Sequence, residues 1–387
     1  QVYKNLIVST KRPLNLRSVN HAPTAKITEK NGLRMYEWNI AKPTVYKEEE
    51  FEPSWYEPYP YIQLSEYQEW KDVIQWALPL YSSANTLPAE LKQKVEEWKK
   101  IVKNDRFDYL DLVTRYVQDE IRYMGIEMGE YSHRPNSPEK VFRQRFGDCK
   151  DKSLLLCTLL RAIGIEAYPA LVNTYKREHL IERLPSPYAF NHVIVVAKID
   201  DSVCWIDPTI SYQRGSVQIQ YLPPYGRALV IRATDTQLTD IPQVYAGITE
   251  ITETYTVPKL GNPAKLEVSS KFSMANADNT RSMFAQNGII DLEKNYADFY
   301  AELFPKSTVT MSDSIIYRDD ELHNVFTINE QYRIDSIWQR PDSTKSTLVL
   351  DINAQILKGK LLFLSKKDRK TPIALNFPYE LYYEVNV

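Results

Sequence analysis

The chain has 387 residues, of which 43% are hydrophobic and 25% charged, so it can bury sizeable cores and is long enough for two or three domains. Its 48 basic and 50 acidic side chains leave a formal net charge of −2, which gives no electrostatic reason to expect a nucleic acid or an anionic membrane surface as a partner. No apolar run approaches the roughly 18 residues that a membrane span requires, so we expect no transmembrane segment in this chain.

The first 64 residues have the pattern of short strands. Val2 to Val8 and Leu33 to Ile40 are β-like pieces, and turn residues such as Asn31-Gly32 separate them. We therefore predict an N-terminal β-sandwich portion over residues 1–64 that is either incomplete or covered by the next domain of the chain. Because the chain begins at Gln1 with neither an initiator methionine nor a signal peptide, we expect a processed or truncated chain.

Three amphipathic helices are predicted at the start of a second domain, residues 65–245. Ser65 begins the first helix with a capping box to Gln68, and the other two begin near Pro88 and Phe107. Each carries apolar side chains at i, i+3 and i+4, the spacing of a buried helical face. In the first helix this face consists of Trp70, Val73, Ile74 and Ala77. We interpret these faces as core rather than as ligand-stacking groups.

A cysteine stands at the start of a fourth, more apolar helix. Asp148 is a favourable N-cap, Asp151 completes an acidic capping box, and Gly164 lies where a left-handed C-cap would end the helix. Cys149 is then the first helical residue. There the helix dipole and unpaired backbone N–H groups favour the thiolate, which is the nucleophilic form.

A β-hairpin downstream supplies the partners that a thiol nucleophile needs. A strand over Phe190 to Ile199 carries His192, and its antiparallel return over Val203 to Asp207 ends in an aspartate. With the turn at residues 200–202, His192 and Asp207 lie opposite or diagonal to each other, within reach for the carboxylate to orient the imidazole. A nucleophile, a base and an orienting carboxylate form the constellation of thiol acyl transfer.

The remaining cysteines and histidines favour structural roles. Cys157 and Cys204 lie in apolar segments, so we interpret them as small core side chains, and His133 is expected to be an exposed loop residue. Three cysteines argue against a disulfide framework. Without a Cys-x-x-Cys pair, a ligand-spaced histidine pair or a glycine-rich phosphate loop, we predict neither a metal nor a cofactor. The connection over residues 174–189 has two equal interpretations, a functional lid and a variable insertion.

The last third of the chain changes to alternating strands. We predict a C-terminal β-rich domain over residues 246–387, interrupted by one helix, Ile289 to Phe304. The helix presents Leu292, Tyr296, Phe299 and Leu303 on one face. Since no catalytic group is predicted there, the domain is a candidate for binding a substrate or a partner.

Four motifs occur in the order seen in transglutaminase-like proteins: Gly147-Asp-Cys-Lys-Asp151, Leu160-Arg-Ala-Ile-Gly-Ile165, Asn191-His192 and Trp205-Ile-Asp-Pro208. The chain resembles this superfamily over about residues 65–245, in particular a bacterial branch whose core is flanked by two β-rich domains. The resemblance implies an α+β fold, with a papain/transglutaminase-like core of helices packed on an antiparallel sheet. It also implies export to the bacterial periplasm or cell envelope.

The resemblance further implies roles for individual residues. Cys149 would be the nucleophile, His192 the general base and acid, and Asp207 the residue that orients His192. Tyr123 is the candidate for stabilising the oxyanion, because the side chain usual in the family has no clear counterpart.

We therefore expect thiol-dependent acyl transfer on peptide or glutamine-like amides. Hydrolysis, deamidation and cross-linking stay open, because one acyl-enzyme serves all three. We expect a protein or peptide as the substrate, without a cofactor, a metal or a nucleic acid. The alternative is an inactive scaffold, or a protein-binding or glycan-binding protein of the envelope, that meets its partner through the β-rich domains.

Overall fold

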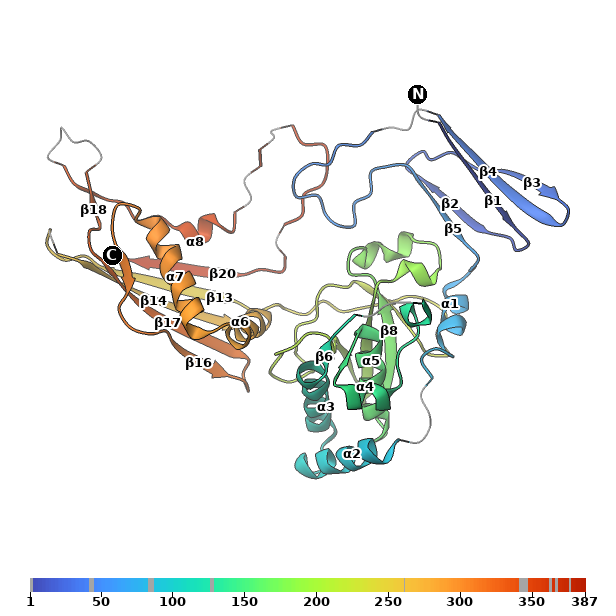
Figure 1. Ribbon diagram of the computed structural model, residues 1–387, viewed down its shortest axis with the longest axis horizontal. Helices are drawn as coiled ribbons and strands as arrows, with labels where there is room; N and C mark the ends of the chain where they lie inside the picture. The colour runs from blue at the N-terminus through green and yellow to red at the C-terminus, as the bar shows by residue number, and fades with distance from the viewer. Residues whose placement is uncertain are drawn as a thin grey trace. The chain divides into compact units, whose positions relative to one another are not determined.

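The computed structural model describes residues 3–41, 45–82, 87–125, 129–260, 262–340, 347–361, 364–365, 368–375 and 377–387 (Figure 1). Contacts between residues divide the chain into two compact units. The first comprises Gln1–Thr209, Leu222–Gln243 and Lys366–Ala374, and the second comprises Ile210–Tyr221, Val244–Ser365 and Leu375–Val387. The expected division at 64/65 and 245/246 differs from this pattern, because residues 1–64 group with the core and the segment 210–221 groups with the C-terminal strands.

The N-terminal part of the first unit is made of two small antiparallel sheets. Strands β1 (Tyr3–Thr10), β4 (Leu33–Ala41) and β3 (Lys26–Lys30) form one sheet in the order β1-β4-β3, and β2 (Asn15–Val19) pairs with β5 (Tyr61–Ser65). Few side chains here are shielded from solvent: Tyr36 and Trp38 on β4 are the buried apolar ones among the described residues before Ser65.

The core of the first unit is a five-stranded antiparallel sheet in the order β10-β9-β8-β11-β12. Its strands are β8 (Glu166–Val172), β9 (His192–Ile199), β10 (Ser202–Ile206), β11 (Arg227–Val230) and β12 (Thr239–Asp240). The α-helices are α1 (Trp70–Ala77), α2 (Ala89–Ile101), α3 (Arg106–Arg115), α4 (Pro138–Gln144) and α5 (Cys149–Arg161). The expected core of helices on an antiparallel sheet is confirmed.

Shorter elements connect these helices and strands. A π-helical turn, η1 (Tyr116–Glu120), extends α3, and the 3-10 helices are η2 (Gly129–Ser132), η3 (Arg177–Glu182) and η4 (Pro187–Ala189). Two short parallel strands, β6 (Arg122–Tyr123) and β7 (Phe146–Gly147), pair just before α5. The connection over residues 174–189 thus folds into η3 and η4.

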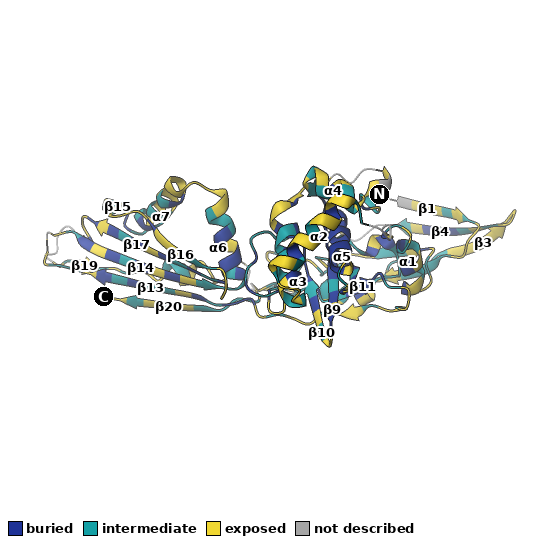
Figure 2. Cartoon of the chain, turned by 90° about the horizontal axis from the view of Figure 1, so that it is seen from below, coloured by how far each residue is buried: buried dark blue, intermediate teal, exposed yellow. Residues whose placement is uncertain are grey.

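The helix α5 is the centre of this core. It packs on β8 and β9, and every residue from Cys149 to Leu160 is buried. Figure 2 shows it almost wholly in the colour of buried residues. Its helical spacing alone would expose one side to water, so burial on all sides requires both the sheet and the surrounding helices.

The first predicted helix begins later than expected. Ser65 is the last residue of β5, and its hydroxyl donates a hydrogen bond to the Pro185 carbonyl. The helix α1 begins at Trp70, with Glu69 as N-cap and Asp72 completing the capping box. A tertiary contact therefore holds Ser65 in extended backbone, whereas the predicted buried face of this helix is correct.

The second unit is a six-stranded sheet with two helices on one face (Figures 1 and 2). Its strands run β15-β17-β14-β13-β20, and β16 also pairs with β17. They are β13 (Thr249–Thr256), β14 (Ala264–Ser273), β15 (Val309–Met311), β16 (Ile316–Asp320), β17 (Val325–Ile334) and β20 (Leu381–Asn386). The helices are α6 (Ala275–Gln286) and α7 (Ile289–Leu303). A short hairpin, β18 (Trp338–Gln339) with β19 (Val349–Leu350), and one helical turn, α8 (Gln355–Lys358), complete it.

The expectation of one helix in this region is wrong, because α6 precedes α7 and α8 follows it. Only α7 has the apolar spacing of an amphipathic helix. The helix α6 instead buries two charged side chains, Asp278 and Arg281, which pair with each other. Because this buried pair is charged, α6 has no apolar periodicity, and its sequence pattern does not predict a helix.

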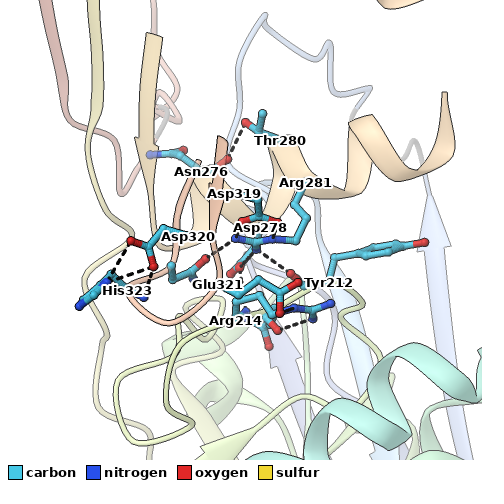
Figure 3. Close-up of polar contacts among 12 residues, drawn as sticks. Tyr212, Arg214, Asn276, Asp278, Thr280, Arg281, Asp319, Asp320, Glu321 and His323 are labelled. Atoms are coloured by element: carbon cyan, nitrogen blue, oxygen red, sulfur yellow. Dashed lines mark hydrogen bonds and ion pairs between the residues drawn. The ribbon is translucent and has the colours of Figure 1, made fainter. Parts of the chain in front are cut away.

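The segment 210–221 is held within the second unit by a cluster of polar contacts (Figure 3). Arg281 donates to the Tyr212 carbonyl at 2.9 Å and forms a two-pronged ion pair with Asp319. Asp278 accepts from the Arg214 backbone N–H at 3.1 Å and from Arg281 at 3.0 Å. The chain enters this cluster directly after Thr209, two residues beyond Asp207.

Across the described residues, no helix is long and apolar enough to cross a membrane.

Candidate active site

The start of α5 has the geometry that its sequence predicts. The Asp148 carboxylate accepts the backbone N–H groups of Lys150 at 2.9 Å and Asp151 at 3.2 Å, while Asp151 accepts the N–H of Asp148 at 3.3 Å. A Cβ on Gly147 would lie 2.6 Å from the Asp151 Cβ, so this capping box requires glycine before it. Cys149 is thereby fixed at the first helical position, beside the positive end of the helix dipole.

His192 and Asp207 lie diagonally across the β9–β10 hairpin. The register pairs Ile206 with Val195, so Asp207 follows directly after the last paired residue of β10. His192 Nε2 and Asp207 Oδ2 are 2.8 Å apart. Of the two predicted arrangements, directly opposite or diagonal, the structure has the diagonal one.

Asp207 is buried, and donors surround its carboxylate. It accepts hydrogen bonds from the Thr209 backbone N–H at 2.8 Å, the Thr209 hydroxyl at 2.6 Å and the Tyr225 hydroxyl at 2.5 Å. Burial alone would raise the pKa of Asp207, but the bonds from His192, Thr209 and Tyr225 lower it. The carboxylate is therefore ionised at neutral pH and can orient the imidazole.

His192 contacts both other residues of the expected constellation. With Nε2 bound to Asp207, its other ring nitrogen, Nδ1, is the one left for the hydrogen bond with Cys149. Burial would lower the pKa of His192, yet the hydrogen bonds with Asp207 and Cys149 raise it to about 10. An imidazolium beside a thiol stabilises the thiolate, so the pair is arranged for nucleophilic attack.

The structure therefore brings Cys149, His192 and Asp207 into one hydrogen-bonded chain, while their catalytic roles stay a prediction. A pocket of about 300 Å³ opens onto Cys149 and His192. Four of the residues that line it are tryptophan, tyrosine or phenylalanine. The other side chains that line it are Trp76, Tyr81, Ser132, His133, Lys150, Leu171, Pro187, Tyr188, Phe190, Asn191 and Val193.

The connection over residues 174–189 contributes to this pocket. Pro187 and Tyr188 line it, and Tyr188 is 86% exposed. The ring of His133 lies between Trp76 and Tyr188, with ring centroids 5.1 and 5.4 Å apart. His133 is half-buried in the pocket wall, rather than the exposed loop residue that the sequence predicts.

Tyr123, the predicted oxyanion stabiliser, is not one of the residues lining this pocket. Its backbone lies close, since β6 pairs Tyr123 with Gly147, but its side chain is 49% exposed. Tyr81 lines the pocket instead and is 6% exposed. Burial and the nearby charge of Cys149 raise the pKa of Tyr81 well above its usual value, so its hydroxyl keeps the proton that it could donate.

A buried lysine links α5 to Asp207. The Lys152 ammonium donates to the carbonyls of Gln118 at 3.1 Å and Ile121 at 2.6 Å, and the Gln118 amide donates to the Asp207 carbonyl at 3.0 Å. Burial lowers the pKa of Lys152 to about 8, while the charge of Asp207 opposes that shift. This network fixes the backbone at the end of β10 relative to the cysteine helix.

Sequence reasoning missed several of these neighbours. An Asp-Pro-Thr sequence is a local signal for the Thr209 hydrogen bonds, because aspartate commonly accepts the N–H two residues later. Tyr81 lies 68 residues from Cys149, and no local pattern indicates it. The same holds for Tyr225 and Gln118, which lie 18 and 89 residues from Asp207 and donate to its side chain and its backbone carbonyl, respectively.

The two remaining cysteines lie in the core. Cys157 and Cys204 are buried, and neither forms a disulfide. Burial raises the pKa of Cys157 to about 12 and raises that of Cys204 as well. Neither shares the helix-start position of Cys149. In the described part of the chain, no three histidine, cysteine or acidic side chains form a group that could hold a metal ion.

A helix-start cysteine, a hairpin histidine and a buried aspartate on a helix-and-antiparallel-sheet core define a transglutaminase-like domain. Residues 94–209 match the family model described as the Transglutaminase-like superfamily. The chain thus contains a transglutaminase-like core with flanking β-rich regions. No curated protein matches it in sequence.

Two solved structures match the chain. The first, described as a "putative protease" from Parabacteroides distasonis, has a TM-score of 0.51 and 12% sequence identity over 86% of this chain. The match spans 66% of that protein's length, and at this identity it shows the fold alone. The second, described as a "putative cysteine protease" from Cytophaga hutchinsonii, has a TM-score of 0.26, 14% identity and a match covering 53% of this chain and 66% of its own.

Proposed function

We propose that the protein is a cysteine hydrolase that cleaves amide bonds in peptides by transferring the acyl group through Cys149 to water. The observation that carries the proposal is the continuous hydrogen-bonded chain from Cys149 through His192 to the buried carboxylate of Asp207, with a pocket at its open end. The description of the Parabacteroides protein of similar fold supports a protease in particular.

In the first half of the reaction, the Cys149 sulfur attacks the carbonyl carbon of the scissile amide. The C–S bond forms as the carbonyl electron pair moves onto oxygen, and the proposed main-chain donor to that oxyanion is the backbone N–H of Cys149, the first residue of α5. His192 then gives its proton to the leaving nitrogen, the C–N bond breaks, and the free amine departs from a thioester.

In the second half, neutral His192 takes a proton from water, and the resulting hydroxide attacks the thioester carbonyl. The C–S bond breaks, the carboxylic acid is released, and the thiolate and imidazolium are restored. An amine in place of water would give cross-linking through the same intermediate. Asp207 holds His192 with Nε2 protonated throughout, which leaves Nδ1 for both proton transfers.

For the oxyanion we propose Tyr81 as the side-chain donor in preference to Tyr123, because Tyr81 lines the pocket and Tyr123 does not. The aromatic wall formed by Trp76, Tyr188 and Phe190 favours an apolar side chain next to the scissile bond.

A peptide mixture incubated with the full chain in ¹⁸O-labelled water tests the proposal. We expect new carboxyl termini carrying ¹⁸O with wild type and none with Cys149→Ala. The matched control is Cys157→Ser, since it changes a buried thiol that has no role in the mechanism. Ammonia release without cleavage would indicate deamidation, and isopeptide products would indicate cross-linking. No covalent product of any of these kinds would favour the scaffold alternative.

We also propose, from the family resemblance alone, that the protein acts in the bacterial periplasm or cell envelope. Fractionation of source cells tests this, and recovery in the cytoplasm would contradict it.

A further inference from the structure

The second unit contains a cavity that is separate from the pocket of Cys149. Its volume is about 510 Å³, within the range of small-molecule sites. It is lined by residues of β13, β14 and β17, by residues of α6, α7 and α8, and by Lys360 and Tyr379. Most of the lining is apolar or aromatic, including Phe272, Tyr296, Phe299 and Tyr300.

One carboxylate lies among the residues that line this cavity. Glu330 on β17 is 3% exposed. The strand register places Glu253, Val268 and Glu330 side by side on three adjacent strands, so both glutamates point to the same face of the sheet. With strands about 4.8 Å apart, two carboxylates are buried roughly 10 Å from each other.

Glu253 is fully supplied with hydrogen-bond donors. It accepts from the hydroxyls of Tyr300 at 3.0 Å, Tyr383 at 2.9 Å and Tyr255 at 3.1 Å. Both of its oxygens are thus bound within the fold. We therefore assign Glu253 a structural role.

Glu330 is only half supplied. Among the described residues its one hydrogen-bond donor is the Tyr332 hydroxyl, which bonds to Oε2, and no lysine or arginine of the described chain pairs with it. Among the described residues no hydrogen-bond donor reaches its Oε1, and Glu330 lines the cavity. Burial raises the pKa of Glu330 to about 7, the Tyr332 bond opposes this, and the charge of Glu253 adds to it. A buried carboxylate with an open oxygen is unfavourable unless a donor or a cation reaches it.

We propose that this cavity binds an alkylammonium group, with its nitrogen on the open oxygen of Glu330 and its apolar chain along the aromatic wall. Tyr296 and Tyr300 also line the cavity, and cation–π attraction to their rings would favour the same nitrogen. Both a free amine and a lysine side chain carry this chemistry.

One cation of the protein also lines the cavity. Lys360 is exposed, and its Nζ lies 5.1 Å from the centroid of the Tyr379 ring. A fatty-acid-like ligand would pair with Lys360 rather than with Glu330. A carboxylate of equal chain length is therefore the control that discriminates between the two charges.

Calorimetric titration of the full chain with octylamine, 1-octanol and octanoate tests the proposal. We expect octylamine to bind at least tenfold more tightly than either control. In Glu330→Gln the advantage over octanol should disappear, while octanol binding is unchanged. The matched control is Glu250→Gln, because Glu250 is exposed on the same strand as the cavity residues Thr249 and Ile251, and pairs with Lys271 at 2.7 Å. Its affinity for octylamine should equal that of wild type.

A second variant keeps the test decisive if Glu330→Gln unfolds. Asn279 is an exposed residue of α6 that lines the cavity, and Asn279→Trp should block all three ligands without disturbing the core. Tighter binding of octanoate than of octylamine, no binding of octylamine, or unchanged octylamine binding in Asn279→Trp would each overturn the proposal. A further titration with Nα-acetyl-lysine amide, which keeps its side-chain ammonium, then distinguishes the two sources. Binding of this compound indicates a lysine side chain as the ligand, and lack of binding indicates a free amine. Peptide hydrolysis enters none of these readouts.

Discussion

Burial lowers the pKa of His192, and the hydrogen bonds with Asp207 and Cys149 raise it. Asp207 is buried and donates no proton itself, but its hydrogen bond helps to raise the pKa of His192 to about 10. A raised pKa means that the imidazolium is stabilised in the folded protein at neutral pH. Its contribution to stability is complete below the unfolded value of about 6.5 and is lost as pH rises through about 10.

We expect Asp207→Asn to shift the alkaline limb of peptide turnover to lower pH. His192 must carry a proton to release the amine, so wild-type kcat/KM should fall only as pH approaches 10. Losing the carboxylate charge lowers the pKa of His192, and turnover should fall by up to about four orders of magnitude. Thr209→Val, which removes one donor to Asp207, is the milder control. An alkaline limb at the same pH in wild type and Asp207→Asn would contradict this role.

The two tyrosine candidates for the oxyanion make opposite predictions. Tyr81→Phe should lower kcat by about 10²- to 10³-fold with little change in KM, since one oxyanion donor is removed. Tyr123→Phe should leave both nearly unchanged, because the Tyr123 side chain is not part of the pocket wall. Steady-state kinetics on one peptide substrate decides between them. The reverse order of effects would restore Tyr123 as the donor.

Among the secondary-structure elements, α5 is the one whose start and end are best predicted from its own sequence. Its cap at Asp148, its first residue Cys149 and the left-handed Gly164 after its end are all local signals, and the structure agrees with each. The hairpin that carries His192 was similarly predictable, because a turn at Asp200 fixes the register of both strands.

Elements that depend on distant contacts were predicted less well. Ser65 has a helix-capping sequence but ends a strand, because its hydroxyl bonds to residue 185. The helix α6 was not predicted, because the side chains that it buries include the charged pair Asp278 and Arg281 and show no apolar spacing. In both cases the deciding partner is far away in sequence or is itself charged.

The cap of α5 should be worth much more than an ordinary cap. Asp148 also forms a buried ion pair with the ammonium of Lys150, 2.7 Å away, so Asp148→Ala breaks this pair as well as the cap. We expect a loss of about 3–5 kcal/mol. The matched control is Asp105→Ala at the exposed start of α3, where the carboxylate accepts two N–H groups in the same way, with a loss of about 1 kcal/mol.

Urea unfolding followed by tryptophan fluorescence measures both variants, since every tryptophan except Trp338 lies in the first unit. Equal losses in the two variants would show that Lys150 does not depend on Asp148.

At the level of the whole chain, the two units are interleaved in sequence. The segment 210–221 follows the site strand but belongs to the second unit, where Arg281 binds the Tyr212 carbonyl. No local pattern reveals this, because the partners are 69 residues apart. A composition change near residue 246 marks one crossing of the chain between the units and misses the others.

We expect Arg281→Met to destabilise the second unit by about 3–5 kcal/mol, because Asp278 would remain buried without its cation. Hydrogen exchange should show faster exchange in α6 and in residues 210–221. The control is His323→Ala, which breaks an exposed pair with Asp320 in the same region and should cost much less than Arg281→Met (Figure 3). Unchanged exchange in residues 210–221 would mean that Arg281 does not anchor them.

The assembled thiol and imidazole are the feature on which the proposed activity depends, and iodoacetamide labelling with peptide mapping tests them without a known substrate. At pH 6 to 7 we expect the full chain to label at Cys149, where the pocket admits a small reagent, while Cys157 and Cys204 stay unmodified in the core. In His192→Ala the labelling of Cys149 should require higher pH, because the imidazolium that stabilises its thiolate is gone. Equal labelling of all three cysteines, or a Cys149 profile that does not change in His192→Ala, would contradict an assembled pair.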